Sequence, residues 1–282
     1  MFDWEDLHYF SVFVQSKSLS AAARELGVDH ATVARRIAAL ERSLSLKLVD
    51  RRPRSYALTL DGERVAGLAD KMREEAYAVA RLALAGQQTL AGEVSISMPP
   101  SIANTFVVPL LTKLRVQYPA IHIHLIAETR LASLSHGEAD IAVRLIRPTD
   151  EGLVARKIAT FVFSLYASPE YLAAVKPEDY VFIAFDGSME ASEQQRWLKE
   201  KAAGRDIVFR SNIVEIQRIA ASAGVGVVML PHYLAERNNL VKVCDEGLVR
   251  ELWLAVHNDM HHTPVVRAVM DFLIGCFTEE SS

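Results

Sequence analysis

The sequence lacks most features that mark secreted, membrane or disulfide-stabilised proteins. Only two of its 282 residues are cysteines, and Cys244 and Cys276 lie far apart and form no metal-ligand pattern. We therefore expect two buried thiols, as in proteins of a reducing cytosol. The first residues carry no basic region before an apolar run, and no apolar run approaches the roughly 20 residues that cross a bilayer. These absences predict a cytoplasmic protein without membrane association.

Catalytic and cofactor signatures are also missing. The motifs G-x-S-x-G, H-E-x-x-H and G-x-x-x-x-G-K-[ST] do not occur, and Gly224-Val225-Gly226 precedes a predicted strand, unlike a dinucleotide fingerprint. His122 and His124 alternate along a predicted strand, where we expect them to face solvent or a subunit interface. Neither this pair nor His261-His262 has a carboxylate or cysteine at ligand spacing. We predict no metal, no cofactor and no catalytic residue.

The charge distribution is uneven. The whole chain carries a formal net charge of −4, with 50% hydrophobic and 23% charged residues, as in a globular protein of two or three domains. Residues 29–54 contain seven basic residues against three acidic ones. A local positive excess in an acidic chain indicates a polyanionic partner. The alternative is a solvated surface.

Two short helices with a tight turn are predicted before this basic region. Apolar residues recur at helical intervals over residues 19–26 and again over residues 30–44. Gly27 suits the left-handed conformation that ends a helix, and the Asp29 carboxylate suits the cap of the next one. The pattern predicts a helix-turn-helix.

The face of the second helix that lies away from its apolar stripe offers groups for DNA. The first two turns of such a helix meet base edges in the major groove, where His30 and Arg35 can donate hydrogen bonds and the alanines allow close approach. We expect Arg36 to meet phosphates. Extended runs over 46–49 and 56–58 predict a hairpin whose basic tip contacts the phosphate backbone or minor groove. The predicted DNA-binding residues are His30, Ala31, Thr32, Ala34, Arg35, Arg36, Arg51, Arg52 and Arg54.

A long helix is predicted over residues 60–90. The segment contains no proline and has one broad apolar stripe. About thirty residues would span roughly 45 Å, and an isolated helix of that length leaves its stripe exposed to water. We therefore expect the helix to pair with a partner, or else to pack on its own domain. Gly86 and Gly92 bracket the junction that follows.

After Gly92, strands alternate with helices. Strands are predicted at 93–98, 121–128, 140–145, 161–168, 181–186, 207–211, 226–231 and 252–257. Helices are predicted at 102–118, 131–136, 192–202, 212–223 and 264–277. This order predicts a mostly parallel sheet with helices on both faces, in two α/β halves joined by crossing strands.

A ligand in such a fold binds where strands end and helices begin, in the crevice between the halves. Ser101 begins a helix, so its hydroxyl and the nearby N–H groups could hold a carboxylate or phosphate, or the hydroxyl could merely cap the helix. For Arg144 we prefer an ion pair between the halves over an anion site. The candidate ligand-binding residues are Pro100, Ser101, Ile102, Thr129, Arg130, Arg144, Asp186, Ser211 and Asn212.

Several spaced segments resemble the LysR-type transcriptional regulators. In the N-terminal part these are Phe10, SLSAAARELGV (18–28), ATVARRIAALE (31–41), LVDRRPR (48–54) and LTLDG (58–62). Further on they are GEADIAVRL (137–145), LYASPEYL (165–172), SAGVGVVMLP (222–231) and residues 253–273, so the resemblance covers nearly the whole chain. The family usually has Ser-Gln-Pro where Asp29-His30-Ala31 stands, which indicates a different operator sequence.

The resemblance implies a domain organisation and a function. Residues 1–59 would form a winged helix-turn-helix, 60–91 a linker helix for dimerisation, and 92–282 an effector-binding domain similar to a small periplasmic binding protein. Its first subdomain would comprise residues 92–162 and 265–282, and its second residues 163–264. A homodimer, commonly assembled into a tetramer, would bind a roughly palindromic site on double-stranded DNA under control of a small effector, which we expect to be anionic. The alternatives are a DNA-binding protein with an enzymatic C-terminal domain and a solute-binding protein.

Overall fold

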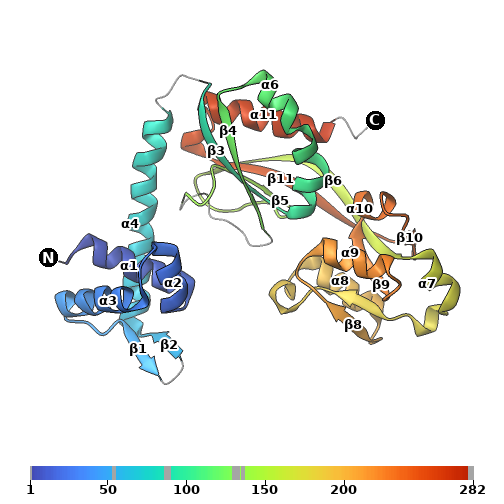
Figure 1. The fold of residues 1–282 in the computed structure, drawn as a ribbon, viewed down its shortest axis with the longest axis horizontal. Coiled ribbons are helices and arrows are strands. Elements are labelled where there is room, and N and C mark those ends of the chain that lie inside the picture. The colour runs from blue at the N-terminus through green and yellow to red at the C-terminus, as the bar shows by residue number, and fades with distance from the viewer. Residues whose placement is uncertain (1, 53–54, 86–89, 129–133, 135–136, 279–282) are drawn as a thin grey trace. The chain divides into compact units, whose positions relative to one another are not determined.

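The computed structural model describes residues 2–52, 55–85, 90–128, 134 and 137–278, and the chain divides into two units, 1–81 and 82–282 (Figure 1). The predicted residues Arg54, Thr129 and Arg130 and most of the helix predicted at 131–136 lie outside the described residues. The first unit contains α1 (Trp4–Ser16), α2 (Leu19–Leu26), α3 (His30–Leu44), β1 (Val49–Arg52), β2 (Ser55–Leu58) and most of α4 (Leu60–Ala85).

The helix-turn-helix forms through the local signals read from the sequence. The Ser18 hydroxyl accepts a hydrogen bond from the Ala21 N–H at the start of α2, and Gly27 ends that helix with φ +66°. The Asp29 carboxylate accepts from the Thr32 N–H at 2.7 Å and caps α3. Phe10 and Val33 are fully buried between the helices. The predicted helix-turn-helix is confirmed.

Helix α4 carries two apolar faces where the sequence suggested one stripe. Ala66 and Ala69 are buried against the core of the first unit, and Val65 and Met72 pack against the same core. Leu68, Val79 and Leu82 are 60%, 71% and 73% exposed. One face of this helix therefore packs on its own domain, and the other is exposed within the described chain. Pairing of the exposed face with a partner stays a prediction.

Nine strands within the described residues of the second unit form one sheet. In chain order they are β3 (Gly92–Met98), β4 (Ile121–Ala127), β5 (Ile141–Arg144), β6 (Leu153–Ala167), β7 (Phe182–Ala184), β8 (Ile207–Arg210), β9 (Val227–Pro231), β10 (Val241–Lys242) and β11 (Leu248–His257). Their spatial order is β4-β3-β5-β11-β6-β9-β7-β8, with β10 paired to β6.

The pairing divides this sheet into two halves. In the first half β3 pairs in parallel with β4 and β5, and in the second half β7 pairs in parallel with β8 and β9. The long strands β6 and β11 pair antiparallel with each other and connect the halves. The prediction of a mostly parallel sheet is thus right within each half and wrong for the whole, because the two connecting strands run antiparallel to each other and to β5 and β9.

Helices cover both halves. The first half has α5 (Pro100–Ile102), α6 (Leu111–Gln117) and α11 (Pro264–Thr278), and the second has α7 (Pro169–Ala174), α8 (Glu193–Ala202), α9 (Val214–Ser222) and α10 (His232–Glu236). The prediction of one continuous helix over 102–118 is wrong. A π-helical turn and a 3-10 turn, Ala103–Val107 and Val108–Leu110, separate α5 from α6. Pro109 lies at this break, where its missing N–H cannot continue an α-helical ladder.

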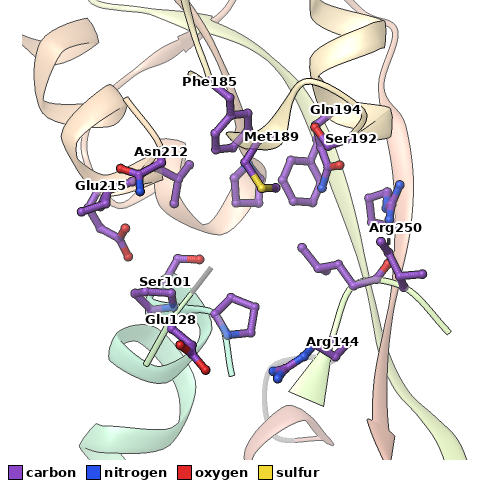
Figure 2. Close-up of a pocket in the computed structure, with 18 residues that line it drawn as sticks. Ser101, Glu128, Arg144, Phe185, Met189, Ser192, Gln194, Asn212, Glu215 and Arg250 are labelled. Carbon is purple, nitrogen blue, oxygen red and sulfur yellow. Dashed lines mark hydrogen bonds between the residues drawn. The ribbon is translucent and has the colours of Figure 1, made fainter. Parts of the chain in front are cut away.

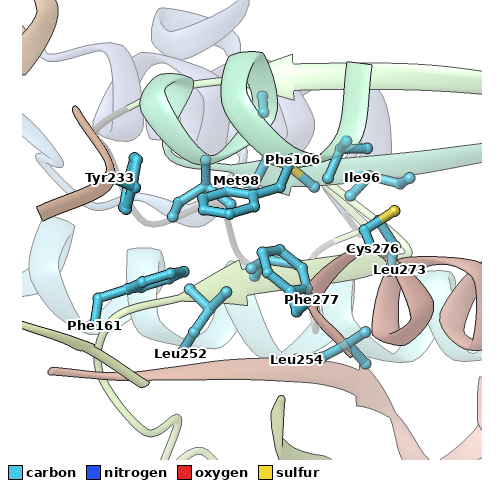
Figure 3. Packing of buried hydrophobic residues seen from close by; sticks show 14 of the residues in the cluster. Ile96, Met98, Phe106, Phe161, Tyr233, Leu252, Leu254, Leu273, Cys276 and Phe277 are labelled. Carbon is cyan, nitrogen blue, oxygen red and sulfur yellow. The ribbon is translucent and has the colours of Figure 1, made fainter. Parts of the chain in front are cut away.

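An aromatic cluster packs the halves together (Figure 3). The ring centroids of Phe106 lie 5.4 Å from Phe161, 4.9 Å from Tyr233 and 5.2 Å from Phe277. Phe106 and Phe277 come from the first half, Tyr233 from the second, and Phe161 from β6. The cluster fixes Tyr233 with its hydroxyl toward the start of α5.

Candidate DNA-binding face and effector pocket

The start of α3 presents an open face. His30, Ala31 and Arg35 are exposed. Thr32 is held by the cap, because its hydroxyl and its N–H both donate to the Asp29 carboxylate, at 3.0 and 2.7 Å. These bonds, led by the one from the backbone, lower the pKa of Asp29. Ala34 is half-buried and lines a small hollow together with Phe13 and Tyr56. The side chains open to a partner here are those of His30, Ala31 and Arg35.

Arg36 points to a different neighbour. Its guanidinium lies 2.6 Å from Glu5, 3.1 Å from Asp6 and 3.7 Å from Asp3, all at the start of α1. The bond to Asp6 raises the pKa of Arg36, and the guanidinium also lies 5.5 Å from the centroid of the Tyr9 ring. Arg36 therefore joins α3 to α1 in this structure, and its predicted phosphate contact stays a prediction.

The hairpin predicted after α3 is present, with β1 beginning at Val49 rather than in the predicted run from Leu46. Val49 pairs with Leu58 and Arg52 with Ser55. The Glu41 carboxylate of α3 accepts hydrogen bonds from the Leu48 and Val49 N–H groups at 2.9 and 3.1 Å and so fixes the entry to β1. The positions of Arg51 and Arg52 in β1 are described, but their side chains are not.

A pocket of about 140 Å³ lies between the two halves of the second unit (Figure 2). Its walls are mainly apolar: Pro99, Pro100, Leu145, Ile146, Phe163, Phe185, Met189, Ile213, Val214 and Pro231. Its polar lining consists of Ser101, Glu128, Arg144, Ser192, Gln194, Asn212, Glu215 and Arg250. An apolar cavity with a few converging polar groups is typical of small-molecule sites.

The structure brings some of the predicted ligand residues together at this pocket and places others elsewhere. Pro100, Ser101, Arg144 and Asn212 line it. The other three described candidates have different neighbours. Ile102 is fully buried in the core, Asp186 caps the 3-10 turn Gly187–Met189 through the Ser188 N–H, and the Ser211 hydroxyl accepts from the Ile213 N–H.

Ser101 is held by a residue of the other half. The buried Tyr233 hydroxyl donates to the Ser101 Oγ at 3.1 Å. Burial raises the pKa of Tyr233, so this phenol keeps its proton. Since Ser101 accepts from Tyr233, its own hydroxyl proton remains to be donated.

Both pocket arginines are engaged by the protein. Arg144 is buried and donates to the Ser97 carbonyl oxygen at 2.8 Å and to the Ser97 hydroxyl at 2.7 Å, which ties it to β3 in its own half. Arg250 of β11 pairs with Glu193 and donates to the Leu145 carbonyl oxygen at 2.8 Å. The ion pair between Arg250 and Glu193 thus connects β11 with α8. The sequence alone did not identify Arg250 as a pocket residue.

Glu215 was also missed. It lies in the first turn of α9, where an acidic residue is common because it complements the helix dipole, so nothing in the sequence set it apart. Both of its carboxyl oxygens are buried at the pocket and have no hydrogen-bond partner among the other residues that the structure describes. Burial raises the pKa of Glu215.

The described residues contain neither a metal-binding cluster nor a membrane-spanning helix. No group of three His, Cys, Asp or Glu side chains that could hold a metal ion occurs among those residues. None of the helices described there is both long and apolar enough to span a membrane. Cys276 is buried as expected, whereas Cys244 is half-buried.

Two family models match the chain. The model described as "Bacterial regulatory helix-turn-helix protein, lysR family" matches residues 4–63, and the "LysR substrate binding domain" matches residues 87–275. The second model alone covers more than half of the 282 residues. The matched residues include both the open face of α3 and the residues that line the pocket.

Similar proteins include the Mau operon transcriptional activator of Paracoccus denitrificans, 27% identical over 98% of this chain and 97% of that protein. The regulator CrgA of Neisseria meningitidis serogroup B is 28% identical over 83% of this chain and 81% of its own. Among solved structures, the full-length virulence activator AphB of Vibrio cholerae superposes with a TM-score of 0.61 at 25% identity, covering 97% of this chain and 99% of AphB.

Proposed function

The chain belongs to the LysR family of transcriptional regulators, and we propose that its α3 helices read a roughly palindromic operator from a dimer while a small molecule in the pocket adjusts that dimer. It is a DNA-binding regulator with an effector-binding domain, and not an enzyme. The observation that carries the proposal is the open face at the start of α3, which leaves His30 and Arg35 exposed next to alanines. These groups can donate to base acceptors in the major groove.

We assign dimerisation to α4. Its exposed side chains Leu68, Val79 and Leu82 recur at helical spacing, and apolar side chains that project into water favour association with a second copy. A dimer with twofold symmetry presents two α3 helices to two half-sites, about 34–36 Å or a multiple of that distance apart. We further propose that dimers assemble into a tetramer and that the protein acts in the cytoplasm.

Regulation would act through the pocket between the halves. A ligand that contacts both halves favours one arrangement of them over others, and it shifts the equilibrium by the difference in its affinity for each arrangement. The linked pairs Tyr233–Ser101 and Arg250–Glu193 already cross this pocket region, so a ligand there changes the surroundings of both. Changed arrangements of the effector domains would alter the spacing of the DNA-binding heads.

Selection from a random DNA library tests the proposed operator. The full-length protein should enrich a sequence with dyad symmetry whose half-sites lie one or more helical turns apart. Enrichment of a single asymmetric site, or of no sequence at all, would contradict the proposal that a dimer binds a palindromic operator.

A further inference from the structure

The charges around the pocket do not suit a simple anion. The two cationic side chains of the lining have strong protein partners: Arg144 donates to Ser97, and Arg250 pairs with Glu193. Two carboxylates, those of Glu128 and Glu215, also line the pocket. A ligand whose only charge is negative would lie beside these carboxylates while the guanidinium groups remain held by the protein.

The Glu215 carboxyl lines this pocket with its hydrogen bonding incomplete. Its two oxygens are buried and accept no hydrogen bond from another of the described residues. Burying a carboxylate without a donor is unfavourable, and accordingly burial raises the pKa of this group. A ligand that brings a donor, and above all a positive charge, would recover that lost interaction.

The surroundings of Glu215 limit what the rest of the ligand is. Figure 2 shows Glu215 and Asn212 on one side of the pocket, with Ser101 and Glu128 facing them from the other. The remaining wall is dominated by proline, aromatic and branched aliphatic side chains. A cavity of about 140 Å³ is similar in size to the dry engineered cavity of about 150 Å³ that binds benzene. The ligand body should therefore be apolar and no larger than one ring or a short branched chain.

We propose that the effector is a small amine with an apolar body, whose ammonium group is received by the Glu215 carboxylate. The inference rests on the proposed function, since it names the ligand class of the same regulatory pocket. It replaces the anionic effector expected from the sequence. The missing partner of Glu215 is supplied by the ligand, and Glu215 on α9 is thereby linked to a body that packs against Pro100 at the start of α5.

Matched probes separate the ligand classes. Calorimetric titration of the full-length protein would compare amines, alcohols and carboxylates that share propyl, isopentyl or benzyl bodies. We expect at least one amine to bind at least tenfold more tightly than the alcohol and the carboxylate of the same body. Tighter binding of a carboxylate, or no binding by any amine, would overturn the proposal.

Glu215→Gln tests the residue itself, and Glu170→Gln is its matched control. Glu170 is likewise the second residue of its helix, α7, but it is exposed and lies outside the pocket lining. We expect Glu215→Gln to remove the tenfold preference for the amine and Glu170→Gln to keep it. An unchanged preference in Glu215→Gln would overturn the assignment.

Proton release gives an independent readout. Arg218 of the same helix and Tyr233 of α10 interact electrostatically with Glu215, and the charged side chains of Glu128, Arg144 and Arg250 line the same pocket. A bound ammonium would lower the raised pKa of Glu215, so amine binding at a pH where this carboxyl is partly protonated should release protons to the buffer. Titrations in two buffers of different ionisation enthalpy should show this release in wild type and its loss in Glu215→Gln. Absence of release in wild type would count against the proposal.

DNA binding separates this inference from the proposed function. Glu215→Gln should unfold at a temperature near that of the wild type and bind the selected operator equally well without amine. If the wild type binds the operator but binds none of the amines, the proposed ligand class is wrong and the proposed DNA-binding function is kept. If no operator is bound by the wild type, the proposed function itself fails.

Discussion

Two neighbouring arginines of α3 show how position decides the role of a residue. Arg35 is exposed on the open face of the helix, whereas Arg36 lies among the three carboxylates at the start of α1. The sequence presents them as an adjacent pair of surface cations. The structure leaves the Arg35 side chain exposed and engages the Arg36 side chain within its own domain.

Alanine substitution should separate these roles. Arg35→Ala should weaken specific operator binding by about 1–3 kcal/mol, concentrated at one base pair, with thermal stability unchanged. Arg36→Ala should lower the thermal unfolding temperature, because the carboxylates of Asp3, Glu5 and Asp6 lose their shared cation. Fluorescence anisotropy and calorimetry of both variants check this. Full operator affinity in a folded Arg35→Ala protein would remove Arg35 as a base reader.

Ser101→Ala should spare operator binding and weaken the effector response. It also leaves the buried Tyr233 hydroxyl without its acceptor, which costs about 1–3 kcal/mol of unfolding free energy. Tyr233→Phe is the control, because it removes the same hydrogen bond and keeps the serine. A normal effector response in Ser101→Ala would leave this residue a structural role alone, and a loss shared equally by both variants would assign the effect to the bond between them.

Residue roles that depend on near neighbours in the sequence could be predicted, and those that depend on distant partners could not. The cap at Asp29 and the left-handed Gly27 are local and were predicted correctly. The ion pairs of Arg36 span thirty residues or more, and the surroundings of Glu215 include Tyr233 and the pocket wall. The spacing of apolar residues along the sequence does not indicate such contacts. The exposed residues at the start of α3 (His30, Ala31 and Arg35) were all predicted, whereas five of the eight polar residues that line the pocket were not.

At the scale of elements, the close approach of α4 to β1 depends on a glycine. A Cβ at Gly62 would overlap the carbonyl oxygen of Leu48, the residue before β1, while a Cβ at Gly67 would meet nothing within 4 Å. Both glycines lie in the same helix, so they form a matched pair.

Alanine should therefore have opposite effects at these two positions. Gly62→Ala should lower the unfolding free energy by about 1–3 kcal/mol, because backbone atoms must move apart. Gly67→Ala should raise it by up to about 1 kcal/mol through helix propensity. Urea denaturation measures both changes. Equal effects of the two substitutions would contradict the packing of α4 against Leu48.

The junction of α3 with the hairpin should weaken in acid. Burial alone would raise the pKa of Glu41, but hydrogen bonds from the Val49 and Leu48 N–H groups and the nearby Lys47 lower it overall. The stability from this group is therefore present above its unfolded pKa of about 4.3 and is lost as the pH falls through the lower folded value. Glu41→Gln should cost about 1–2 kcal/mol near pH 7. The difference from wild type should shrink below pH 4, and a constant difference across this range would contradict the assignment.

Element order was predicted better than element limits. The predicted strands of the second unit, and its predicted helices apart from the one at 131–136, occur in the predicted order, since their apolar patterns are local. The short elements α7, α10 and β10 were not predicted. Strand β6, however, begins at Leu153 rather than at residue 161, because its first part carries exposed basic residues and is recruited by pairing with β11. The break in the helix predicted at 102–118 follows from Pro109, a signal that was present in the sequence but outweighed by the apolar periodicity.

At the scale of the whole molecule, association through α4 is the step that turns a helix-turn-helix into a reader of paired half-sites. Val79→Glu places a charge in the exposed apolar stripe and should shift the protein toward monomers in analytical ultracentrifugation, with weaker operator binding. Tyr77→Glu, two residues earlier on a different side of the helix, is the control and should keep the dimer. Retained dimers in Val79→Glu would contradict this role for the stripe.

The sequence resembled one family from end to end, so the overall architecture and the class of function could be predicted from ordered motifs. The chemistry of the effector could not. The pocket is lined by residues of α5, β5, β6, α8, α9, β9 and β11 and of the loops beside them, so its balance of charges is set only when these elements pack together. A carboxylate such as that of Glu215 becomes buried through that packing.

Sequence-specific recognition is the central claim, and a salt series of DNA binding tests it most directly. The affinity of the full-length protein would be measured for DNA flanking its own gene and for random DNA of equal length from about 50 to 200 mM salt. We predict that both affinities fall with salt but that the flanking DNA stays bound at least about a thousandfold more tightly throughout. Equal and equally salt-dependent binding to the two DNAs would contradict the claim and leave only a basic surface.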